Sequence, residues 1–426
     1  MGGLYGHMEH PHDINNFTFG DLKGLTRDFF SGRISGMTEK LDGMNVFATV
    51  NTEGEVRFAR NGGQASDIDG GMTIKDMEER WHDNISIFNA YKNAYRLFYD
   101  LVKKLDDPVG FFNGDGYRLY ANCEVIDPQH PNVIKYGKTI LSIHGLIGFT
   151  TGENVVRFEV PENENKAKMN TLKKSISDMN SPYGTVQLTP NVIFNATEDC
   201  EDTLLNLIAD IDHIEEISET DDNTRIIDYK KVMLKKYLEY MGQSDVLNCP
   251  FIDLFITRWA YKDRTKNERP EMPNAVQLRK MVLTSGIANA AEVYKSIYSF
   301  EKNCLDQVFK ELMIPVENFV YSLGNAAISS CHGFANEGFE NETIASLVEQ
   351  MEETKNLVAS NNDEEMEKTY VWCLNTLEYL GNRYNITEGV VFRYKGHTLK
   401  LTGSFAALNK AINLRFVAEK KQKNQD

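Results

Sequence analysis

No apolar run in this sequence approaches the roughly 20 residues that a helix needs to cross a bilayer. Cysteine is scarce as well: the six cysteines are scattered, and no two of them form a C-x-x-C pair. That scatter argues against a zinc ribbon and against a disulfide framework, and it indicates a reducing compartment. The N-terminus also lacks the charged, apolar and small-residue succession of a secretory signal. We therefore expect a cytoplasmic protein that does not enter a membrane.

Basic residues are in the minority. The chain of 426 residues has 46 Lys and Arg against 62 Asp and Glu, a net charge of −16. This balance speaks against a protein that coats nucleic acid through a broad basic surface. It excludes neither an enzyme with a local basic site nor one whose carboxylates bind metal ions. Hydrophobic residues make up 41%, and a chain of this length can form two or three domains with real cores.

The order of sequence patterns predicts an α+β protein in three segments. Apolar patterns predict strands over residues 17–19, 37–50, 55–60, 119–126, 139–149, 186–194, 389–394 and 398–401. Helical spacing predicts helices over 21–30, 74–104 and 166–179, and further helical patterns run almost throughout 201–380. We therefore expect a first core part at 1–198, a large, mostly α-helical insertion at 199–382, and a last core part with a basic tail at 383–426.

One short motif carries a chemical signal. Lys40-Leu41-Asp42-Gly43 places a lysine and an acidic residue on a glycine turn, and Asn45 follows just before apolar strand residues. A lysine acts as a covalent nucleophile in its neutral form, which nearby cations or metal ions favour. If it attacks a nucleotide phosphate, basic groups must offset the negative charge and carboxylates must bind Mg²⁺. Taken alone, the tetrapeptide equally fits an exposed lysine at a strand end.

Four residues further along the chain supply such partners in order. Arg60 ends a predicted strand and precedes a glycine-rich loop suited to a phosphate. Glu124 and Lys400 are single charges within apolar strand patterns, and Glu388 opens the strand at 389–394. Buried charges are costly unless they are paired or ligated, so isolated charges at strand positions indicate a shared polar site. The alternative is a salt bridge in the core for Glu124 and Lys400, and a solvated strand end for Arg60.

This ordered set resembles the covalent nucleotidyltransferases, which are ATP-dependent DNA ligases, RNA ligases and mRNA-capping enzymes. In that superfamily Lys-x-Asp-Gly is motif I, a strand with a Glu is motif III, a Glu-Gly strand start is motif IV and a Lys strand is motif V. Asn45, where DNA ligases usually carry Arg, makes the resemblance closest to RNA ligases of the phage and kinetoplastid-editing type. It covers residues 10–195 and 385–403 and implies a ligase-type core of antiparallel sheets with flanking helices.

The resemblance also implies a function. RNA ligases of this type join 5′-phosphate and 3′-hydroxyl ends of nucleic acid through a lysyl-AMP intermediate, using ATP with Mg²⁺ or Mn²⁺. We therefore expect a cytoplasmic, phage-like enzyme of nucleic acid repair. Lys40 corresponds to the catalytic nucleophile and Glu388 to a metal-binding carboxylate. The nucleotide-binding residues implied are Glu39, Asp42, Gly43, Asn45, Arg60, Glu124, His144 and Lys400.

Some of the implied contacts are specific, and one motif is incomplete. Glu124 would contact the ribose, and Arg60 and Lys400 would contact phosphates. His144 would stand in for the aromatic ring that usually stacks on adenine. Thr402 occupies the position of a second motif V lysine, and only a short tail follows it. We therefore expect neither an OB domain nor another separate domain after motif V.

Two alternatives stay open at this point. The first is a nucleotidyltransferase that does not ligate, of a capping or protein-modifying type, and the expected lack of an OB domain argues against capping. The second is a degenerate relative that binds nucleotide or nucleic acid without catalysis, which the missing second lysine and the acidic composition motivate. The sequence does not determine whether the substrate is RNA or DNA, nor the oligomeric state.

Three histidines lie close together near the N-terminus, at His7, His10 and His12. Their spacing alone would be compatible with a metal site. Terminal histidines flanked by Gly and Pro are more often disordered than ligating, so we assign them no metal.

Overall fold

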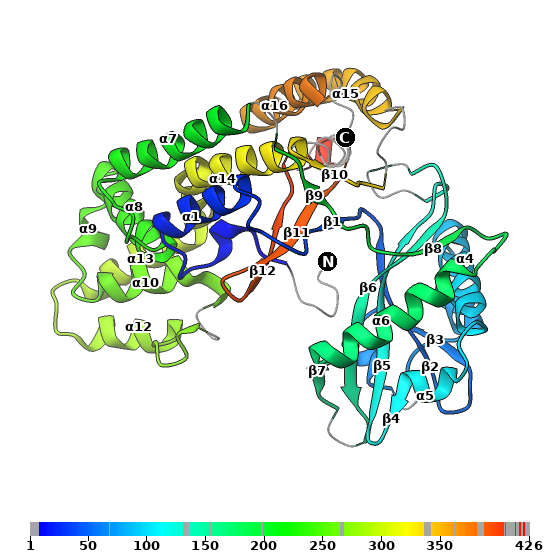
Figure 1. The fold of residues 1–426 in the computed structure, drawn as a ribbon. Helices are drawn as coiled ribbons and strands as arrows, with labels where there is room; N and C mark the ends of the chain where they lie inside the picture. The colour runs from blue at the N-terminus through cyan, green and yellow to red at the C-terminus, as the bar shows by residue number, and fades with distance from the viewer. Residues whose placement is uncertain are drawn as a thin grey trace.

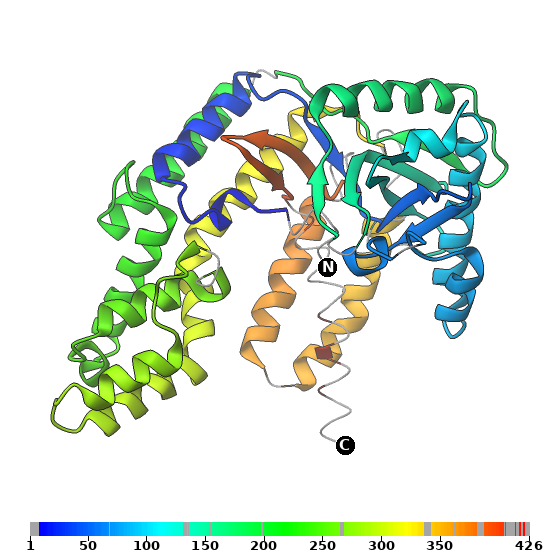
Figure 2. The same cartoon turned by 90° about the horizontal axis from the view of Figure 1, so that it is seen from below.

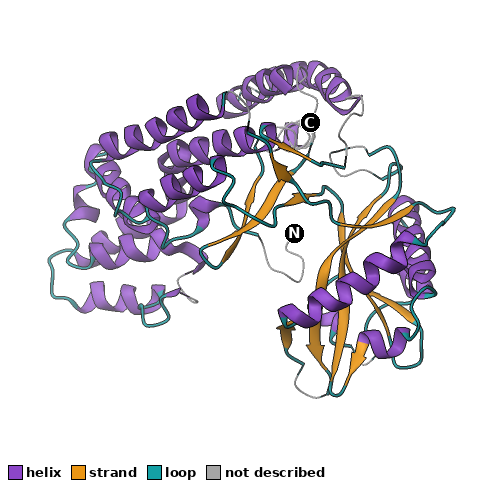
Figure 3. Cartoon of the chain, in the orientation of Figure 1, coloured by secondary structure: helices purple, strands orange, loops and turns teal. Residues whose placement is uncertain are grey.

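The computed structural model of this chain describes residues 8–421 except 68, 131–133, 135, 153–154, 197–198, 265–267, 336–341, 362, 381–386, 404, 406–413, 415–416 and 419–420. Helices and mostly antiparallel sheets are both extensive, so the protein is of the α+β class. Figure 1 shows a strand-rich lobe on one side, a helical lobe on the other and a small sheet between them. Figure 3 shows the same division by secondary structure.

The larger sheet forms the strand-rich lobe. Its strand order is β3-β2-β5-β6-β7, with β4 beside β5 and β8 beside β6, and only β6 with β8 is parallel. The strands are β2 (Met44–Val50), β3 (Val56–Ala59), β4 (Asn113–Gly114), β5 (Tyr117–Ile126), β6 (Ile140–Thr150), β7 (Arg157–Glu159) and β8 (Thr185–Leu188).

Helices cover one face of the larger sheet. They are α3 (Ile74–Arg80), α4 (Ile85–Val102), α5 (Pro108–Phe112) and α6 (Glu162–Ser177), whereas the short helix α2 (Gly62–Ala65) lies on the other face. Alternate residues of β2, such as Val46 and Ala48, share a hydrophobic core with Leu97 and Phe98 of α4. Between them, Phe47 turns to the other face, where a smaller core lies. The period of two along each strand therefore gives both faces an apolar part.

The small sheet has the order β1-β11-β12, in which β1 (Thr38–Lys40) and β12 (His397–Leu401) flank β11 (Gly389–Tyr394). Both pairings are antiparallel, and Lys40 lies opposite Gly389. On one face, Val390 and Leu401 are fully buried in a core shared with helices. The other face therefore carries the alternate residues, among them Val391 and Lys400.

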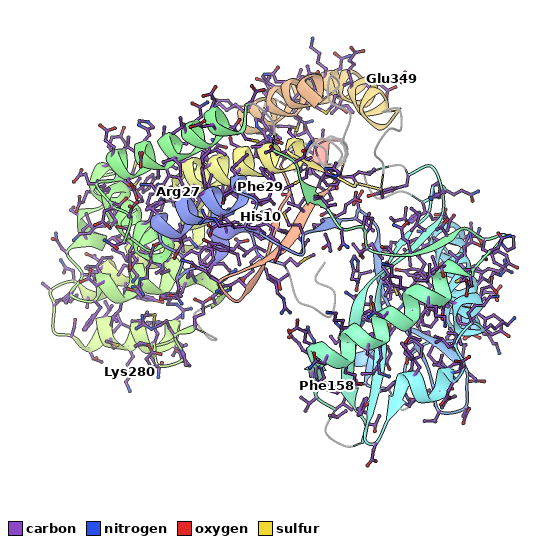
Figure 4. All side chains as sticks on the ribbon, in the orientation of Figure 1. His10, Arg27, Phe29, Phe158, Lys280 and Glu349 are labelled. Atoms are coloured by element: carbon purple, nitrogen blue, oxygen red, sulfur yellow. The ribbon has the colours of Figure 1, made fainter. Side chains whose placement is uncertain are left out.

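Helices from the middle of the chain pack on the small sheet. α1 (Phe19–Phe30), α7 (Cys200–Ser218) and α14 (Leu305–Ser329) share one core with β11 and β12, and Figure 4 labels Phe29 of α1 there. The expected helical insertion at 199–382 is indeed mostly helical. Its helices α7 and α14 nevertheless complete the core of the first and last segments, so the segment does not fold around a core of its own alone.

A further group of helices forms the outer part of the helical lobe around a second core. They are α8 (Ile226–Tyr240), α9 (Ser244–Leu247), α10 (Ile252–Tyr261), η2 (Lys262–Arg264), α12 (Ala275–Thr284) and α13 (Ala290–Asn303). Over the described part of the chain, no helix combines the length and the apolar character needed to span a bilayer.

A helical hairpin packs against the loop that follows Lys40. It consists of α15 (Glu342–Ser360) and α16 (Glu364–Leu380), which Figure 2 shows projecting between the two lobes. Its buried residues share a core with Leu41, Ile126 and Tyr136, and with Phe405 and Leu414 of the C-terminal segment. A short antiparallel sheet pairs β9 (Ile193–Phe194) with β10 (Cys331–His332), which follows α14 in the chain.

The predicted strand at 17–19 is wrong. Thr18 makes only an isolated bridge and instead caps α1. Its hydroxyl oxygen accepts a hydrogen bond from the backbone N–H of Asp21 (3.0 Å), and the Asp21 carboxylate accepts one from the N–H of Thr18 (2.9 Å). This reciprocal capping satisfies two helix-end donors and outweighs the strand preference of the neighbouring phenylalanines.

Three longer predicted elements are interrupted. The predicted strand at 37–50 breaks between β1 and β2, and the predicted helix at 74–104 is two helices. The second helix starts at a new cap, since Asn84 accepts a hydrogen bond from the N–H of Ile87 (3.3 Å). The predicted strand at 186–194 divides into β8 and β9 around Pro190, whose carbonyl accepts a hydrogen bond from the N–H of Glu39 (3.0 Å).

Candidate active site

The Lys-x-Asp-Gly motif links the two sheets. Lys40 is the last residue of β1 in the small sheet, and Met44 is the first residue of β2 in the larger sheet. Only three residues lie between them. The loop therefore holds the end of one sheet against the other, and residues from both sheets surround Lys40.

Gly43 allows the loop to lie close against β5. A Cβ atom at this position would come within 2.6 Å of the carbonyl oxygen of Val125 and 2.8 Å of Cγ of Glu124. Both distances are shorter than real Cβ contacts, and one neighbour is rigid backbone. The motif needs glycine here because the loop approaches the Glu124 strand so closely.

Asp42 holds the loop in place. It is 6% exposed, and its Oδ2 accepts a hydrogen bond from the backbone N–H of Ile134 (2.7 Å). The backbone N–H of Asp42 donates to the hydroxyl of Tyr136 (3.1 Å). Burial raises the pKa of Tyr136 well above its ordinary value, helped by the charges of Glu39, Asp42 and Glu388. Tyr136 was not singled out from the sequence, where it appears only as one aromatic residue in a loop.

Lys40, the last residue of β1, forms an ion pair with Glu388, which directly precedes β11. Both side chains are 16% exposed. Burial raises the pKa of Glu388 to about 7, although the charge of Lys40 acts in the opposite direction. The negative charges of Asp42 and Glu124 raise it further. The structure therefore brings the predicted nucleophile together with three of the predicted carboxylates.

Lys400 lies on the same face of the small sheet as Lys40. Thr38, Val391 and Lys400 are aligned across the three strands, and Lys40 follows Thr38 by two residues. Lys400 is 9% exposed, and burial lowers its pKa, with the charge of Lys40 acting in the same direction. Glu388 opposes this shift. Two lysines and one carboxylate therefore share a small, largely buried area.

The larger sheet adds polar groups around Glu124. Asn45 lies opposite Glu124 in the sheet, and its Nδ2 donates to Oδ1 of Asn122 (2.8 Å). Asn45 Oδ1 is buried and has no hydrogen-bond partner among the described residues. A donor from a ligand would satisfy it, since buried polar groups are almost always hydrogen-bonded. Asn122 was missed in the sequence, although it precedes Glu124 by two residues and so shares its face.

His144 sits at an irregularity of the larger sheet. The pairing of β5 with β6 shifts there, because Asn122 pairs with Gly145 and the next residue pairs with Ile143. His144 is exposed, with Nε2 3.4 Å from Oε2 of Glu124 and Nδ1 2.8 Å from the hydroxyl of Thr189. Bulges often re-aim a side chain next to a functional site. The structure thus brings His144 to Glu124 and fixes its ring from both sides.

Arg60 lies at the border of this group. Its guanidinium carbon is 5.4 Å from the centre of the Tyr91 ring, a cation–π distance. Burial raises the pKa of Tyr91 to about 12, with Arg60 opposing the shift and Glu124 adding to it. The glycine-rich stretch after Arg60 forms the short helix α2, which Asn61 caps. No contact between Arg60 and Lys40 is seen in the described part of the chain.

Glu39 takes a different position from the other motif I residues. It is 1% exposed, and its Oε2 accepts a hydrogen bond from the backbone N–H of Ala335 (2.7 Å). Adjacent residues of a strand point to opposite faces, so Glu39 and Lys40 lie on opposite sides of β1. Its contact with Ala335 ties β1 to the segment after β10.

The donor set fits a metal ion that arrives with a nucleotide. Within the described residues, no group of three or more His, Cys, Asp or Glu side chains is arranged to hold a metal ion by itself. Mg²⁺ usually takes one or two protein carboxylates and fills its other positions with phosphate oxygens and water. The charges of Asp42 and Glu124 raise the pKa of Glu388, and these three carboxylates are the groups that could bind the ion here.

Comparisons with known proteins bring no relative to this site. No family model, no curated protein and no solved structure matches the chain. The proposal of a function therefore depends on the residues and geometry described above.

Proposed function

We propose that this protein is an ATP-dependent polynucleotide ligase of the covalent nucleotidyltransferase type, with RNA as the favoured substrate. The observation that carries the proposal is the ion pair of Lys40 with Glu388, with Lys400 beside it on the same sheet face. The motif loop also brings Asp42 and the Glu124 strand to this place. If the Lys-x-Asp-Gly sequence had arisen by chance, there would be no reason for Glu388, Lys400 and Glu124, which lie far away in the sequence, to surround Lys40.

The first step transfers AMP to Lys40. The Glu388 carboxylate takes a proton from the Lys40 ammonium, and the neutral amine attacks the α-phosphorus of ATP. A nitrogen–phosphorus bond forms, and the bond from the α-phosphorus to the bridging oxygen breaks with its electron pair on the leaving pyrophosphate. The nitrogen then loses a second proton to solvent, which leaves the lysyl-AMP phosphoramidate. Lys400 and Arg60 offset phosphate charge. Bound Mg²⁺ would further reduce the charge of the triphosphate.

The later steps join two ends of nucleic acid. An oxygen of a 5′-phosphate attacks the phosphorus of lysyl-AMP, and the Lys40 nitrogen leaves with a proton. A 3′-hydroxyl then attacks the 5′-phosphate, loses its proton to solvent, and releases AMP as the strand is sealed. Asn45, in the position that separates RNA from DNA ligases in the resembling family, favours RNA.

Labelling with α-labelled ATP and Mg²⁺ tests the first step. The wild type is expected to become covalently labelled, and Lys40→Ala and Lys40→Arg are expected to lose the label. Lys75→Ala, a change of an exposed lysine on α3, is the matched control and keeps it. Absence of label on the wild type with each of the four nucleotides would overturn the proposal, and equal label on Lys40→Ala would exclude Lys40.

Sealing assays test the later steps. The labelled protein is offered a nicked RNA duplex, single-stranded RNA with a 5′-phosphate, and the matching DNA substrates. Joined product with RNA in excess over DNA is expected. Covalent label that never passes to any 5′-phosphate end would instead indicate a nucleotidyltransferase that does not ligate. A GTP arm in the labelling assay separates adenylyl from guanylyl transfer.

A further inference from the structure

The N-terminal segment runs along the outer edge of the small sheet. Glu9 forms a parallel bridge with Leu399 of β12, and the backbone N–H of Lys400 donates to the carbonyl oxygen of Glu9 (3.0 Å). A short helix, η1 (Pro11–Asp13), follows directly. Figure 4 labels His10 beside the small sheet, in the middle of the molecule. Residues 9–13 therefore lie next to the candidate motif V lysine.

His10 and His12 lie within the described residues of this segment, whereas His7 lies outside them. Their rings stack with centroids 5.4 Å apart and planes 14° from parallel. The backbone N–H of His10 donates to the carboxylate of Asp13 (2.9 Å), which closes the turn. The Nδ1 atom of His12 is buried and has no hydrogen-bond partner among the described residues. A buried ring nitrogen of this kind is a place for a ligand atom.

Charges around His12 connect it to the site. Burial lowers the pKa of His12, Asp13 opposes the shift, and the charges of Lys230 and Lys400 add to it. Lys230 lies on α8, and its Nζ donates to Oδ1 of Asn15 (3.1 Å). His12 therefore lies within reach of the charges of two lysines, and one of these, Lys400, is in turn influenced by the charge of Lys40.

We propose that His12 and Lys230 bind the β- and γ-phosphates of ATP, the part that leaves as pyrophosphate when Lys40 takes AMP. This inference rests on the proposed function and assigns residues that the motif resemblance does not. In phosphoryl transfer the attacking and leaving atoms lie on opposite sides of the phosphorus. The strand order places Lys40 on β1, Lys400 on β12 and His12 beyond β12. An α-phosphate between the two lysines would direct the leaving pyrophosphate toward His12.

The charge requirements agree with this placement. A triphosphate carries several negative charges, and its leaving half gains charge as the bond breaks, so cations and hydrogen-bond donors are needed there. The N–H of a neutral His12 ring can donate to a phosphate oxygen, and Lys230 supplies a positive charge. Asp13 Oδ1 lies 3.9 Å from Nε2 of His12, and Asn15 Oδ1 accepts a hydrogen bond from Lys230.

The test separates the step that uses pyrophosphate from the steps that do not. His12→Ala and Lys230→Ala are each expected to lower covalent labelling from ATP at least tenfold. Both are expected to seal a pre-adenylylated 5′ end, which needs no ATP, within twofold of wild type. The concentration of inorganic pyrophosphate that half-discharges lysyl-AMP back to ATP is expected to rise at least tenfold in His12→Ala.

Controls make each outcome decisive. His213→Ala, an exposed histidine on α7, is expected to leave every rate unchanged. His12→Gln keeps a hydrogen-bond donor and is expected to recover part of the labelling. This variant tests the role of His12 if His12→Ala does not fold. Full labelling in His12→Ala, or equal losses in labelling and in pre-adenylylated sealing, would overturn this inference. A wild type that neither labels nor seals would instead overturn the proposed function.

Discussion

Lys40 and Glu388 lie far apart in the sequence and form an ion pair where the end of β1 meets the start of β11. The pairing depends on Gly389, which lies opposite Lys40 and has a φ of +151°. A Cβ atom on Gly389 would lie 2.1 Å from the carbonyl oxygen of Leu401. The Glu-Gly pair at the start of β11 is therefore what lets the Glu388 carboxylate reach Lys40.

The raised pKa of Glu388 predicts how self-labelling depends on pH. Burial raises this pKa to about 7, and a carboxyl that is protonated below pH 7 cannot accept the proton of Lys40. The single-turnover labelling rate should rise about tenfold per pH unit below pH 7 and level off above it. It is measured with α-labelled ATP from pH 5.5 to pH 8.5.

Glu388→Gln tests the same carboxylate without a pH change. The amide cannot take a proton, so the labelling rate should fall roughly 100-fold or more. Glu79→Gln, on the exposed side of α3, is the control and should behave as the wild type. A wild-type rate that stays flat between pH 6 and pH 8 would contradict the role given to Glu388.

Gly43→Ala should displace the motif loop. The added Cβ would meet the carbonyl oxygen of Val125, which is rigid backbone, so the loop must move away from β5. Overpacking of this kind costs about 1–3 kcal/mol, and a shift of Lys40 should lower labelling roughly 100-fold. Urea unfolding and labelling measure the two effects. In Gly63→Ala the new Cβ meets nothing closer than 3.4 Å, so both properties should be kept; equal losses in the two variants would refute the account of Gly43.

Tyr136→Phe should loosen the loop without a large change of packing. It removes the hydroxyl that accepts a hydrogen bond from the N–H of Asp42, at a cost of about 1 kcal/mol in the free energy of unfolding. Labelling should fall roughly tenfold because Asp42 is adjacent to the Lys40 turn. Tyr183→Phe, at an exposed tyrosine, should change neither. Unchanged labelling in Tyr136→Phe would show that the hydroxyl does not position the site.

Lys23→Met should destabilise the helical cover of the small sheet. Lys23 of α1 is 6% exposed and bonds three carboxylates, Asp212 (2.6 Å), Glu215 (2.7 Å) and Asp222 (2.6 Å). Its loss leaves these like charges together, at a cost of roughly 2 kcal/mol. That is less than for a fully buried pair, since Asp212 and Asp222 are well exposed.

Urea unfolding at pH 7 measures the effect of Lys23→Met. Lys75→Met, which removes an exposed lysine paired with Glu79, should stay within about 0.5 kcal/mol of wild type. A Lys23→Met protein as stable as the wild type would mean that the three carboxylates do not depend on Lys23.

Much of the candidate site could be predicted from the sequence. Glu124 and Lys400 stood out because a single charge in an apolar strand pattern needs a partner, and the structure places both near Lys40 through Glu388. Asn45 stood out from its place after Gly43 and lies opposite Glu124. Tyr136 and Asn122 could not be recognised so readily, because a lone tyrosine in a loop and an asparagine in a strand have many ordinary roles.

The sequence by itself determined the α+β class, the positions of most strands and helices, and the candidate residues, because local periodicity sets the face that each side chain takes. Only the tertiary structure decided that β1 and β2 belong to different sheets, so that the Lys40 loop joins the two. It also decided that α7 and α14 complete the core of the small sheet, and that the segment at 9–13 lies beside Lys400. These outcomes depend on pairings between segments far apart in the chain, and a period along one strand does not encode which strand will be its neighbour.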